Sequence, residues 1–287
     1  MDSSAIVYST GSPFTNTTRS ARLQGRRKEV KKLSIIIPCY NEGNTISILL
    51  DRVLEVKLQG IIEKEVIIVN DCSKDNTDSL IEAYIYAYPD ADLKYIKHTY
   101  NQGKGAAVKT GRANATGDLT IIQDADLEYN PGEYPLLLEP ILTGDADIVY
   151  GSRFMGGRPH RILFFWHTLG NKLMTFFSNL FTNMNLTDAH TCLKVVPTEL
   201  FKAIDLHEDG FAFDAELNVK ISKIHRLRIY EVGISYYGRT FADGKKIRLK
   251  DAIRSLWCIL KYSVRSGRKS VITSRHDFSK QGQIPVV

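Results

Sequence analysis

Short apolar segments alternate with segments of helical periodicity across the first half of the chain, and this alternation restricts the possible folds most. Strands are predicted at residues 33–38, 65–71, 93–98, 118–124 and 146–151. Helices are predicted over 44–56, from Asp75 or Asn76 to just before Pro89, over 103–114 and near 132–142. This order predicts an α/β fold in which helices cover both faces of a mainly parallel sheet. Right-handed crossovers then bring the loops after the strands to one edge, where ligands bind.

The pattern changes after Gly151. Residues 161–185 have helical periodicity and are rich in Phe and Trp. Further segments are predicted as a strand at 192–197, a helix at 213–224, a strand at 228–238 and a basic helix from about Leu249. We therefore expect a single domain over residues 31–265.

Both ends of the chain are predicted to be tails. Residues 1–30 are rich in Ser, Thr and Gly and then become basic, which indicates a mobile basic tail. Residues 266–287 are predicted to form a flexible C-terminal tail. The basic cluster of the first tail suits contact with anionic lipid and a solubilising role equally well.

Composition limits the classes of partner. The net charge of +6 over 287 residues suits an anionic partner: nucleic acid, an acidic membrane surface or a phosphorylated substrate. Nucleic acid is disfavoured, because basic and aromatic residues are not interleaved on one predicted face. The four cysteines form no C-x-x-C pair, so neither a zinc cluster nor a disulfide framework is indicated, and a reducing cytosol fits best. No apolar run approaches the roughly 20 residues of a membrane-spanning helix, so we expect a soluble or peripheral protein.

Two carboxylates, Asp124 and Asp126, stand at the exit of the strand predicted at 118–124. Strand side chains alternate faces, so both point to the same side. A divalent cation would relieve their mutual repulsion, and hard oxygen ligands suit Mg²⁺ or Mn²⁺. The alternative is a solvated acidic turn, because Asp is a common turn residue.

The first two strands end in Tyr40-Asn-Glu42 and Asn70-Asp71. If these strands are parallel neighbours, Glu42 and Asp71 lie side by side, where they can accept hydrogen bonds from ribose hydroxyls and a base N–H. Tyr40 offers a ring on which a base can stack. Helix capping explains Glu42 equally well, and it is the favoured explanation of Asp75 and Thr77.

Two glycine-containing segments carry cations. Gly103-Lys104-Gly105 opens a predicted helix, where backbone N–H groups face anions and Lys104 can reach a phosphate. Arg239 and Lys246 lie in Tyr236–Lys246, a segment suited to a diphosphate leaving group. A common Gly–Lys turn and an exposed basic hairpin are the respective alternatives.

Seven motifs occur in the order PCYNEGN, VNDCSKDNT, NQGKGAAVKTG, QDADLE, YGSR, TDAHTCLK and YYGRTFADGKK. Over roughly residues 33 to 260 this order resembles family-2 glycosyltransferases of the GT-A type. It is most similar to the dolichyl-phosphate or polyprenyl-phosphate sugar synthase group. The resemblance implies a GT-A fold with a nucleotide-binding sheet and a C-terminal acceptor-side region. It also implies metal-dependent, inverting transfer of a hexose from a nucleotide-sugar to a polyprenyl phosphate.

The resemblance also implies roles for individual residues. The nucleoside would be bound by Pro38, Tyr40, Glu42 and Asp71. The metal and diphosphate would be bound by Asp124, Asp126 and Glu128, with Arg239 and Lys246 holding the diphosphate. Arg153 would meet the acceptor phosphate with help from Arg161, Asp188 would face the reacting centre, and Glu216 would border the acceptor side. His190 departs from the family pattern and is interpreted as a satisfied surface histidine.

Several alternatives stay open at this point. UDP-glucose is the preferred donor and GDP-mannose the second. The aromatic segment at 161–185 fits either an anionic membrane surface or an ordinary core helix pair. We expect a cytoplasmic protein, peripheral on the cytoplasmic face of a membrane. A glycosyltransferase with a soluble glycan or small-molecule acceptor is the alternative enzyme, and a non-catalytic nucleotide-sugar-binding protein is the alternative of another class.

Overall fold

The computed structural model describes residues 29–58, 63–157, 159, 161–162, 165–239 and 249–265. The two predicted tails lie outside the described residues, apart from positions 29 and 30. Among the described ranges, no helix combines the length and the apolar composition that crossing a bilayer requires.

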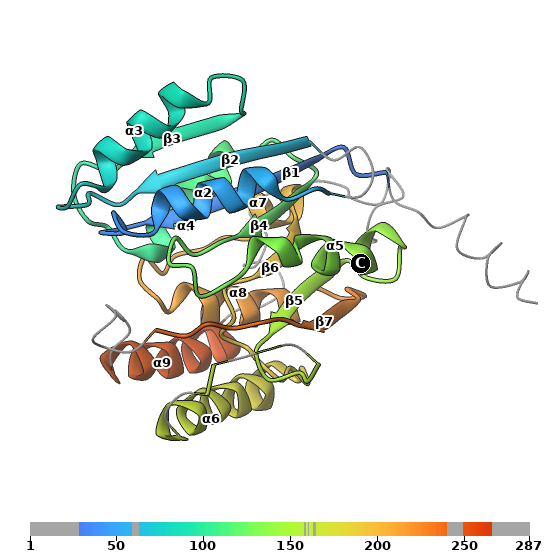
Figure 1. Ribbon diagram of the computed structural model, residues 1–287. Helices are drawn as coiled ribbons and strands as arrows, with labels where there is room; N and C mark the ends of the chain where they lie inside the picture. The colour runs from blue at the N-terminus through green and yellow to red at the C-terminus, as the bar shows by residue number, and fades with distance from the viewer. Residues whose placement is uncertain are drawn as a thin grey trace, which may run out of the picture.

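A mixed sheet forms the centre of the described part of the chain, with seven strands in the order β3-β2-β1-β4-β6-β5-β7 (Figure 1). The strands are β1 (Lys32–Cys39), β2 (Glu63–Asn70), β3 (Leu93–Lys97), β4 (Leu119–Ile122), β5 (Ile148–Ser152), β6 (Lys194–Pro197) and β7 (Ile229–Gly233). All neighbouring pairs are parallel except those of β6, which runs antiparallel to β4 and β5. The predicted mainly parallel sheet is therefore confirmed.

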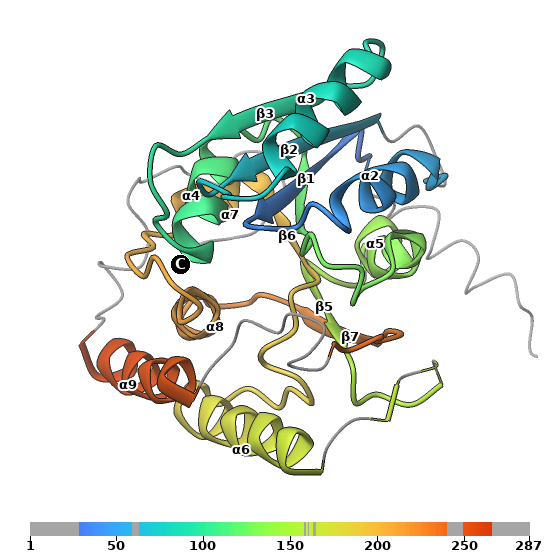
Figure 2. The same cartoon turned by 60° about the vertical axis from the view of Figure 1, so that its left-hand side comes forward.

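Helices cover both faces of this sheet (Figure 2). One face carries α2 (Ile46–Glu55), α3 (Thr77–Ala87), the 3-10 turn η1 (Pro131–Glu133) and α5 (Tyr134–Leu142). The other carries α4 (Lys104–Asn114), α7 (Thr198–Ala203) and α8 (Phe213–Ser222). Two longer helices, α6 (Phe165–Thr182) and α9 (Leu249–Arg265), pack on each other and on α8. The short helix α7 was not predicted.

The continuous apolar runs of β1 and β2 are those of strands buried on both faces. Residues 35–37 of β1 and 67–69 of β2 are fully buried. At the start of α3, Asp75 takes the predicted capping role, because its Oδ1 accepts a hydrogen bond from the backbone N–H of Thr77 at 3.1 Å. The parallel register of β1 and β2 ends at Cys39 beside Asn70, so the loops after both strands begin at the same edge of the sheet.

The strand predicted at 228–238 is shorter in the structure, because β7 ends at Gly233. Beyond it the chain leaves the sheet, and the backbone N–H of Ser235 donates to the buried carboxylate of Glu133 at 3.0 Å. Two residues later the backbone N–H of Tyr237 donates to the carbonyl oxygen of Glu128 at 2.9 Å. Glu133 thus turns the chain toward the loop that follows β4.

Candidate active site

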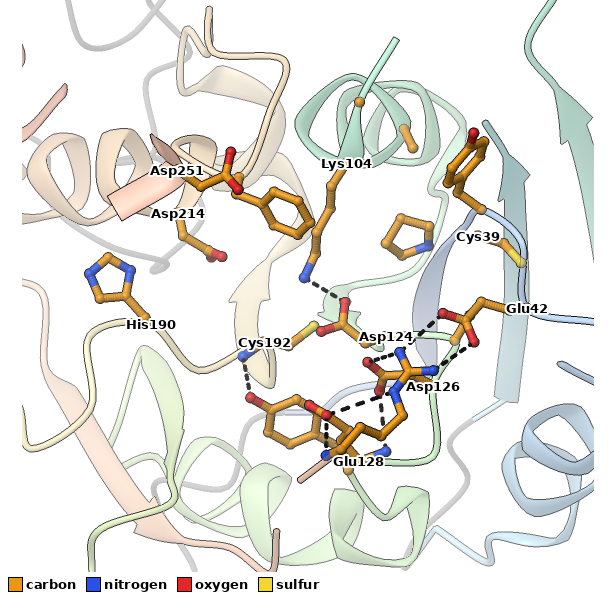
Figure 3. Close-up of a pocket in the computed structure, with 18 of the residues that line it drawn as sticks. Cys39, Glu42, Lys104, Asp124, Asp126, Glu128, His190, Cys192, Asp214 and Asp251 are labelled. Atoms are coloured by element: carbon orange, nitrogen blue, oxygen red, sulfur yellow. Dashed lines mark hydrogen bonds and ion pairs between the residues drawn. The ribbon is translucent and has the colours of Figure 1, made fainter. Parts of the chain in front are cut away.

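A cavity of about 740 Å³ opens at the edge of the sheet where β1, β2 and β4 end (Figure 3). The predicted residues that line it are Pro38, Tyr40, Glu42, Asp71, Lys104, Asp124, Asp126, Glu128, Arg153 and Arg239. They come from six separate stretches of the chain. The structure therefore brings most of the predicted site together.

Carboxylates from two loops meet two cations near the middle of this cavity. Lys104 Nζ lies 2.5 Å from Asp124 Oδ1. Arg239 lies between the other acids, with Nη2 at 2.9 Å from Asp126 Oδ2 and the same guanidinium 3.2 Å from both oxygens of Glu42. Glu42 thus uses its side chain for Arg239 and for Thr45 Oγ1 at 2.8 Å, and its backbone carbonyl for the start of α2.

Negative charge exceeds positive charge in this group, because four carboxylates (Glu42, Asp124, Asp126 and Glu128) face two cations. Burial and the charges of Asp124 and Glu128 raise the pKa of Asp126 to about 7, against the opposing effect of Arg239. Burial also acts to raise the pKa of Asp124, but the Lys104 ammonium beside it outweighs burial and holds that pKa below its usual range. With all four acids ionised the group lacks two positive charges, which a divalent cation can supply.

The predicted metal ligands are Asp124, Asp126 and Glu128. Among the residues that the structure describes, no group of three acidic, histidine or cysteine side chains is assembled to hold a metal ion. Lys104 and Arg239 contact the first two acids, and Glu128 accepts hydrogen bonds from Tyr236 Oη at 2.9 Å and from the Arg239 backbone N–H at 2.6 Å. The charge excess fits a cation, whereas a ready three-ligand set is absent from the described residues.

The predicted nucleoside residues line one end of the cavity, but Asp71 also organises the protein. Its Oδ1 accepts from the Gln102 backbone N–H at 2.8 Å and lies 2.7 Å from His98 Nδ1, and its Oδ2 accepts from the Gly103 N–H at 2.7 Å. His98 in turn bonds Thr110 through Nε2 at 2.9 Å. Sequence reasoning missed His98, because a lone histidine after a strand carries no motif.

The two glycines around Lys104 allow α4 to pack closely on its neighbours. A Cβ at Gly103, where φ is +100°, would lie 2.6 Å from the Asp209 carbonyl oxygen. A Cβ at Gly105 would lie 2.4 Å from the carbonyl oxygen of Glu208. The Asp209 oxygen also accepts from the Ala106 N–H at 3.0 Å, so protein groups already use the first turn of α4. Both glycines thus permit close packing of α4 on residues 208–210; Gly103 also lines the cavity, and the phosphate-loop role stays a prediction.

The predicted catalytic residue Asp188 does not line the cavity. It is fully buried and accepts two hydrogen bonds from the Arg153 guanidinium. Arg153 Nε donates to Asp188 Oδ2 at 2.6 Å, and Nη2 donates to Oδ1 at 2.8 Å. Burial would raise the pKa of Asp188, but the Arg153 charge and hydrogen bonds lower it below its usual range. Arg153 itself faces the cavity, with its guanidinium carbon 5.1 Å from the Tyr236 ring centroid. Asp188 is therefore a positioning residue for Arg153.

Two other predicted residues, Arg161 and Glu216, are not part of the cavity lining. Arg161 lies outside the lining and donates to the Gly238 carbonyl oxygen at 3.1 Å, which supports the loop that carries Arg239. Glu216 is fully buried, because it pairs with Lys220 at 2.7 Å and accepts backbone N–H bonds from residues 207 and 208. Neither side chain lines the cavity, and their roles on the acceptor side stay predictions. Lys246 lies outside the described residues.

Several lining residues were missed by sequence reasoning, among them Tyr129, Asn171, Met174, Cys192, Phe211, Asp214, Asp251 and Ser255. His190 is also part of the lining, so its interpretation as a surface histidine is wrong. These residues come from the loop after β4, the loop before β6, and α6, α8 and α9 with the loop before α8, which converge on the cavity only in the folded chain. Tyr129, His190 and Cys192 lie in or beside motifs already singled out in the sequence, whereas the residues of α6, α8 and α9 carry no such signal.

Comparisons with known proteins bear on the family and the fold. The family model for glycosyl transferase family 2 matches residues 34–205. Among solved structures, glucosyl-3-phosphoglycerate synthase from Mycobacterium tuberculosis, in complex with Mn²⁺, UDP and glucosyl-3-phosphoglycerate, superposes with a TM-score of 0.61. The two chains share 17% sequence identity, and the match covers 91% of this chain and 88% of the other. This likeness establishes a shared fold.

Two curated relatives resemble the chain in sequence. A dolichol-phosphate mannosyltransferase of Pyrococcus furiosus is 29% identical over 235 residues, which are 80% of this chain and 64% of that protein. A dolichyl-phosphate beta-glucosyltransferase of Dictyostelium discoideum is 28% identical over 234 residues, which are 75% of this chain and 68% of that protein. The chain thus spans about two thirds of the length of these relatives.

Proposed function

The chain belongs to glycosyl transferase family 2, and from that premise we propose that it transfers a hexose from a nucleotide-sugar to a polyprenyl phosphate with inversion at the anomeric carbon. The observation that carries this proposal is the cavity at the strand ends, with its excess of carboxylates in the middle and Arg153 in its wall. UDP-glucose is the preferred donor and GDP-mannose the second. The relatives named above include a glucosyltransferase and a mannosyltransferase, both acting on dolichyl phosphate by name.

The donor would lie along the cavity floor. Its nucleoside would contact Pro38, Tyr40, Glu42 and Asp71, which all line the cavity. Asp124 and Asp126 would hold Mg²⁺ or Mn²⁺, and the ion would supply positive charge to the diphosphate. Arg239 and Lys104 already lie among these acids and can add hydrogen bonds to the same oxygens.

The acceptor phosphate would meet Arg153. This guanidinium is oriented by the buried carboxylate of Asp188, whose backbone N–H is itself held by Glu231 at 3.0 Å. A lipid phosphate is already ionised near neutral pH, so it needs no general base. Asp188 then acts through the orientation of Arg153, which agrees with its position behind the cavity wall.

An apolar face on α6 and α9 supports an anionic membrane surface as the partner. On α6, Phe165, Trp166 and Phe176 are exposed, with Trp166 at 77%, so this segment does not form a core helix pair. On α9, Trp257 is 61% exposed, and Ile253 and Val264 are exposed with it. The two helices lie together on one side of the molecule (Figure 2). Aromatic side chains beside the cations of Lys172 and Lys250 suit the headgroup region of a bilayer. This arrangement supports a peripheral position on a membrane, and the cytoplasmic face stays a prediction.

The test is transfer by the purified protein with Mn²⁺ or Mg²⁺, radiolabelled UDP-glucose or GDP-mannose, and a short polyprenyl phosphate. We expect labelled lipid that depends on the metal and on the lipid phosphate. Transfer to soluble glycans without the lipid would support the alternative acceptor class. Binding of a nucleotide-sugar without transfer or hydrolysis under any condition would support a binding protein instead.

A further inference from the structure

Tyr236 lines the cavity and contacts two residues that the proposed reaction uses for different substrates. Its side chain is 8% exposed. Its hydroxyl Oη donates a hydrogen bond to Glu128 Oε2 at 2.9 Å. Its ring lies beside Arg153, whose guanidinium carbon is 5.1 Å from the ring centroid. One side chain therefore contacts an acid of the proposed metal and diphosphate side and the cation proposed for the acceptor phosphate.

The backbone of Tyr236 is anchored, so its side chain has a defined direction. The Tyr236 N–H donates to the Pro159 carbonyl oxygen at 3.2 Å, and the Tyr236 carbonyl oxygen accepts from the Arg161 N–H at 2.8 Å. The N–H groups of both neighbouring residues are hydrogen-bonded as well. The Tyr129 ring packs on the Tyr236 ring, with the two centroids 5.5 Å apart. The position of the Tyr236 side chain is therefore fixed by the segments around it.

On the donor side, the Tyr236 hydroxyl orients Glu128. The other oxygen of Glu128, Oε1, accepts from the Arg239 N–H at 2.6 Å, and the Glu128 N–H donates to Asp126 Oδ1 at 3.2 Å. Figure 3 shows Glu128 beside Asp126 in the acid cluster. Burial and the charge of Glu128 raise the pKa of Tyr236 above its ordinary value, against the effect of Arg153, so the hydroxyl stays protonated and donates. Hydrogen bonds of this kind hold a carboxylate in the orientation that a metal ion requires.

On the acceptor side, two aromatic rings and one carboxylate hold Arg153. Its guanidinium carbon lies 5.7 Å from the Phe154 centroid, in addition to the contact with Tyr236. A guanidinium beside a ring face is attracted by the quadrupole of the ring. Asp188 already binds Nε and Nη2, so the rings restrict the remaining movement of the group.

Direct displacement requires the leaving diphosphate and the attacking phosphate to lie on opposite sides of one anomeric carbon. A misplacement of about 1 Å in such an arrangement can cost about 100-fold in rate. We propose that Tyr236 is a positioning residue that sets the spacing between the two sides, through its hydroxyl on Glu128 and its ring on Arg153. This inference rests on the proposed function, because it takes Glu128 and Arg153 as residues of the donor side and the acceptor side.

The first test removes the hydroxyl alone. Tyr236→Phe loses the bond to Glu128 and keeps the ring beside Arg153. Calorimetric titration of Mn²⁺ into the protein with UDP and no acceptor should show about 10-fold weaker Mn²⁺ binding than in wild type, because Glu128 loses the donor that orients it. The KM for the lipid phosphate should stay within about twofold of wild type.

The second test removes the rings. Phe154→Leu leaves Tyr236 and Glu128 in place, so the KM for the lipid phosphate should rise about threefold with no change in Mn²⁺ affinity. Tyr236→Leu removes the ring and the hydroxyl together. Its Mn²⁺ affinity should fall as in Tyr236→Phe, its KM for the lipid phosphate should rise about fivefold, and its kcat should fall about 10-fold because the spacing is lost.

Tyr230 is the matched control, because it is an exposed tyrosine of β7 outside the cavity lining. Tyr230→Phe and Tyr230→Leu should leave all three quantities at their wild-type values. An unchanged Mn²⁺ affinity in Tyr236→Phe, or an unchanged KM for the lipid phosphate in Tyr236→Leu, would overturn the inference. Equal changes of both quantities in Tyr236→Phe and in Phe154→Leu would indicate a general loss of structure and would overturn it too.

This inference and the proposed function fail on different results. If wild type binds Mn²⁺ and UDP but transfers no hexose to a polyprenyl phosphate, the proposed function fails, and the Mn²⁺ affinity of Tyr236→Phe still decides whether the hydroxyl orients Glu128. If wild type transfers hexose and the Tyr236 variants match it, the positioning role fails and the proposed function stands. Binding of neither Mn²⁺ nor a nucleotide by wild type would remove both.

Discussion

Carboxylates removed from solvent lie at both ends of the central strands. Glu65 at one end and Asp126 at the other have pKa shifts of opposite direction. At the start of β2, Glu65 is fully buried and accepts hydrogen bonds from the backbone N–H groups of Thr116 and Gly117 and from Lys94 at 2.7 Å. Burial would raise the pKa of Glu65, but these partners and Ser34 lower it to about 2. Beyond β4, the pKa of Asp126 is instead raised to about 7.

The difference shows which end is structural and which is functional. The partners of Glu65 satisfy its charge within the protein, so the group ties β1, β2, β3 and the turn before β4 together. The acids around Asp126 have too few cations, so the folded chain keeps unneutralised charge at the edge where loops meet. Perturbed ionisable groups of that kind mark sites that await a charged ligand.

The largest effect is expected from a substitution of Asp126, at the functional end. Asp126→Asn keeps the shape of the side chain but removes one of the charges that would draw the cation and diphosphate. We expect hexose transfer to fall about 1000-fold, in the range of other lost electrostatic contacts in active sites. The midpoint of thermal unfolding should stay the same or rise, because the substitution relieves repulsion with Asp124 and Glu128. Initial rates at saturating donor and a thermal melt measure the two quantities, and retained full activity in the presence of metal would contradict the assignment.

A substitution of Glu65, at the structural end, should lower stability and leave the transfer rate nearly unchanged. Glu65→Gln leaves Lys94 without its carboxylate, leaves Lys32 with Asp92 alone, and weakens the acceptor of two backbone N–H groups. We expect the free energy of unfolding to fall by about 3 kcal/mol, with the transfer rate per folded molecule within about twofold of wild type. Urea denaturation and active-site titration would measure these quantities. A variant that is stable but inactive would show that the two ends are not separate.

The contribution of Glu65 to stability should also depend on pH. Because the pKa of Glu65 is about 2 in the folded protein and 4.5 ordinarily, its contribution is complete above pH 4.5 and is lost as the pH falls toward 2. The stability gap between wild type and Glu65→Gln should therefore shrink between pH 5 and pH 2.5, by roughly 2 kcal/mol. Urea unfolding at both pH values measures the gap. A gap that does not change with pH would mean that Glu65 is not ionised in the folded chain.

Part of the functional end could be predicted from the sequence. The strand exits placed Asp124, Asp126, Glu42 and Asp71 together, because parallel strands and alternating side chains leave little freedom there. Arg153 and Arg239 also reached the cavity as the family resemblance implied.

The remainder depended on contacts between segments far apart in the chain. Asp188 lies behind Arg153, Glu216 is enclosed by the backbone of residues 207–208, and His190 is turned into the cavity wall. None of these outcomes follows from local periodicity, because each depends on how the folded chain packs around the residue. The packing of Gly103 and Gly105 could not be predicted for the same reason, because residues 208–210, on which they pack, are distant in the sequence.

The smallest effect is expected from a substitution of Glu133. This residue connects the end of β7 to the segment that carries Arg239. Both of its oxygens lie within 3.1 Å of the Ser235 backbone nitrogen, at the point where the chain leaves β7 on its way to Arg239. Glu133→Gln keeps one carbonyl oxygen as acceptor but removes the charge, so we expect a loss of about 1 kcal/mol in the free energy of unfolding. The donor KM should rise about threefold, because Arg239 is held less firmly among the acids, while the KM for the lipid phosphate stays unchanged. Steady-state kinetics with each substrate varied in turn measures both constants, and an equal rise in the two would show that the loss at Ser235 also reaches the Tyr236 ring and Arg153.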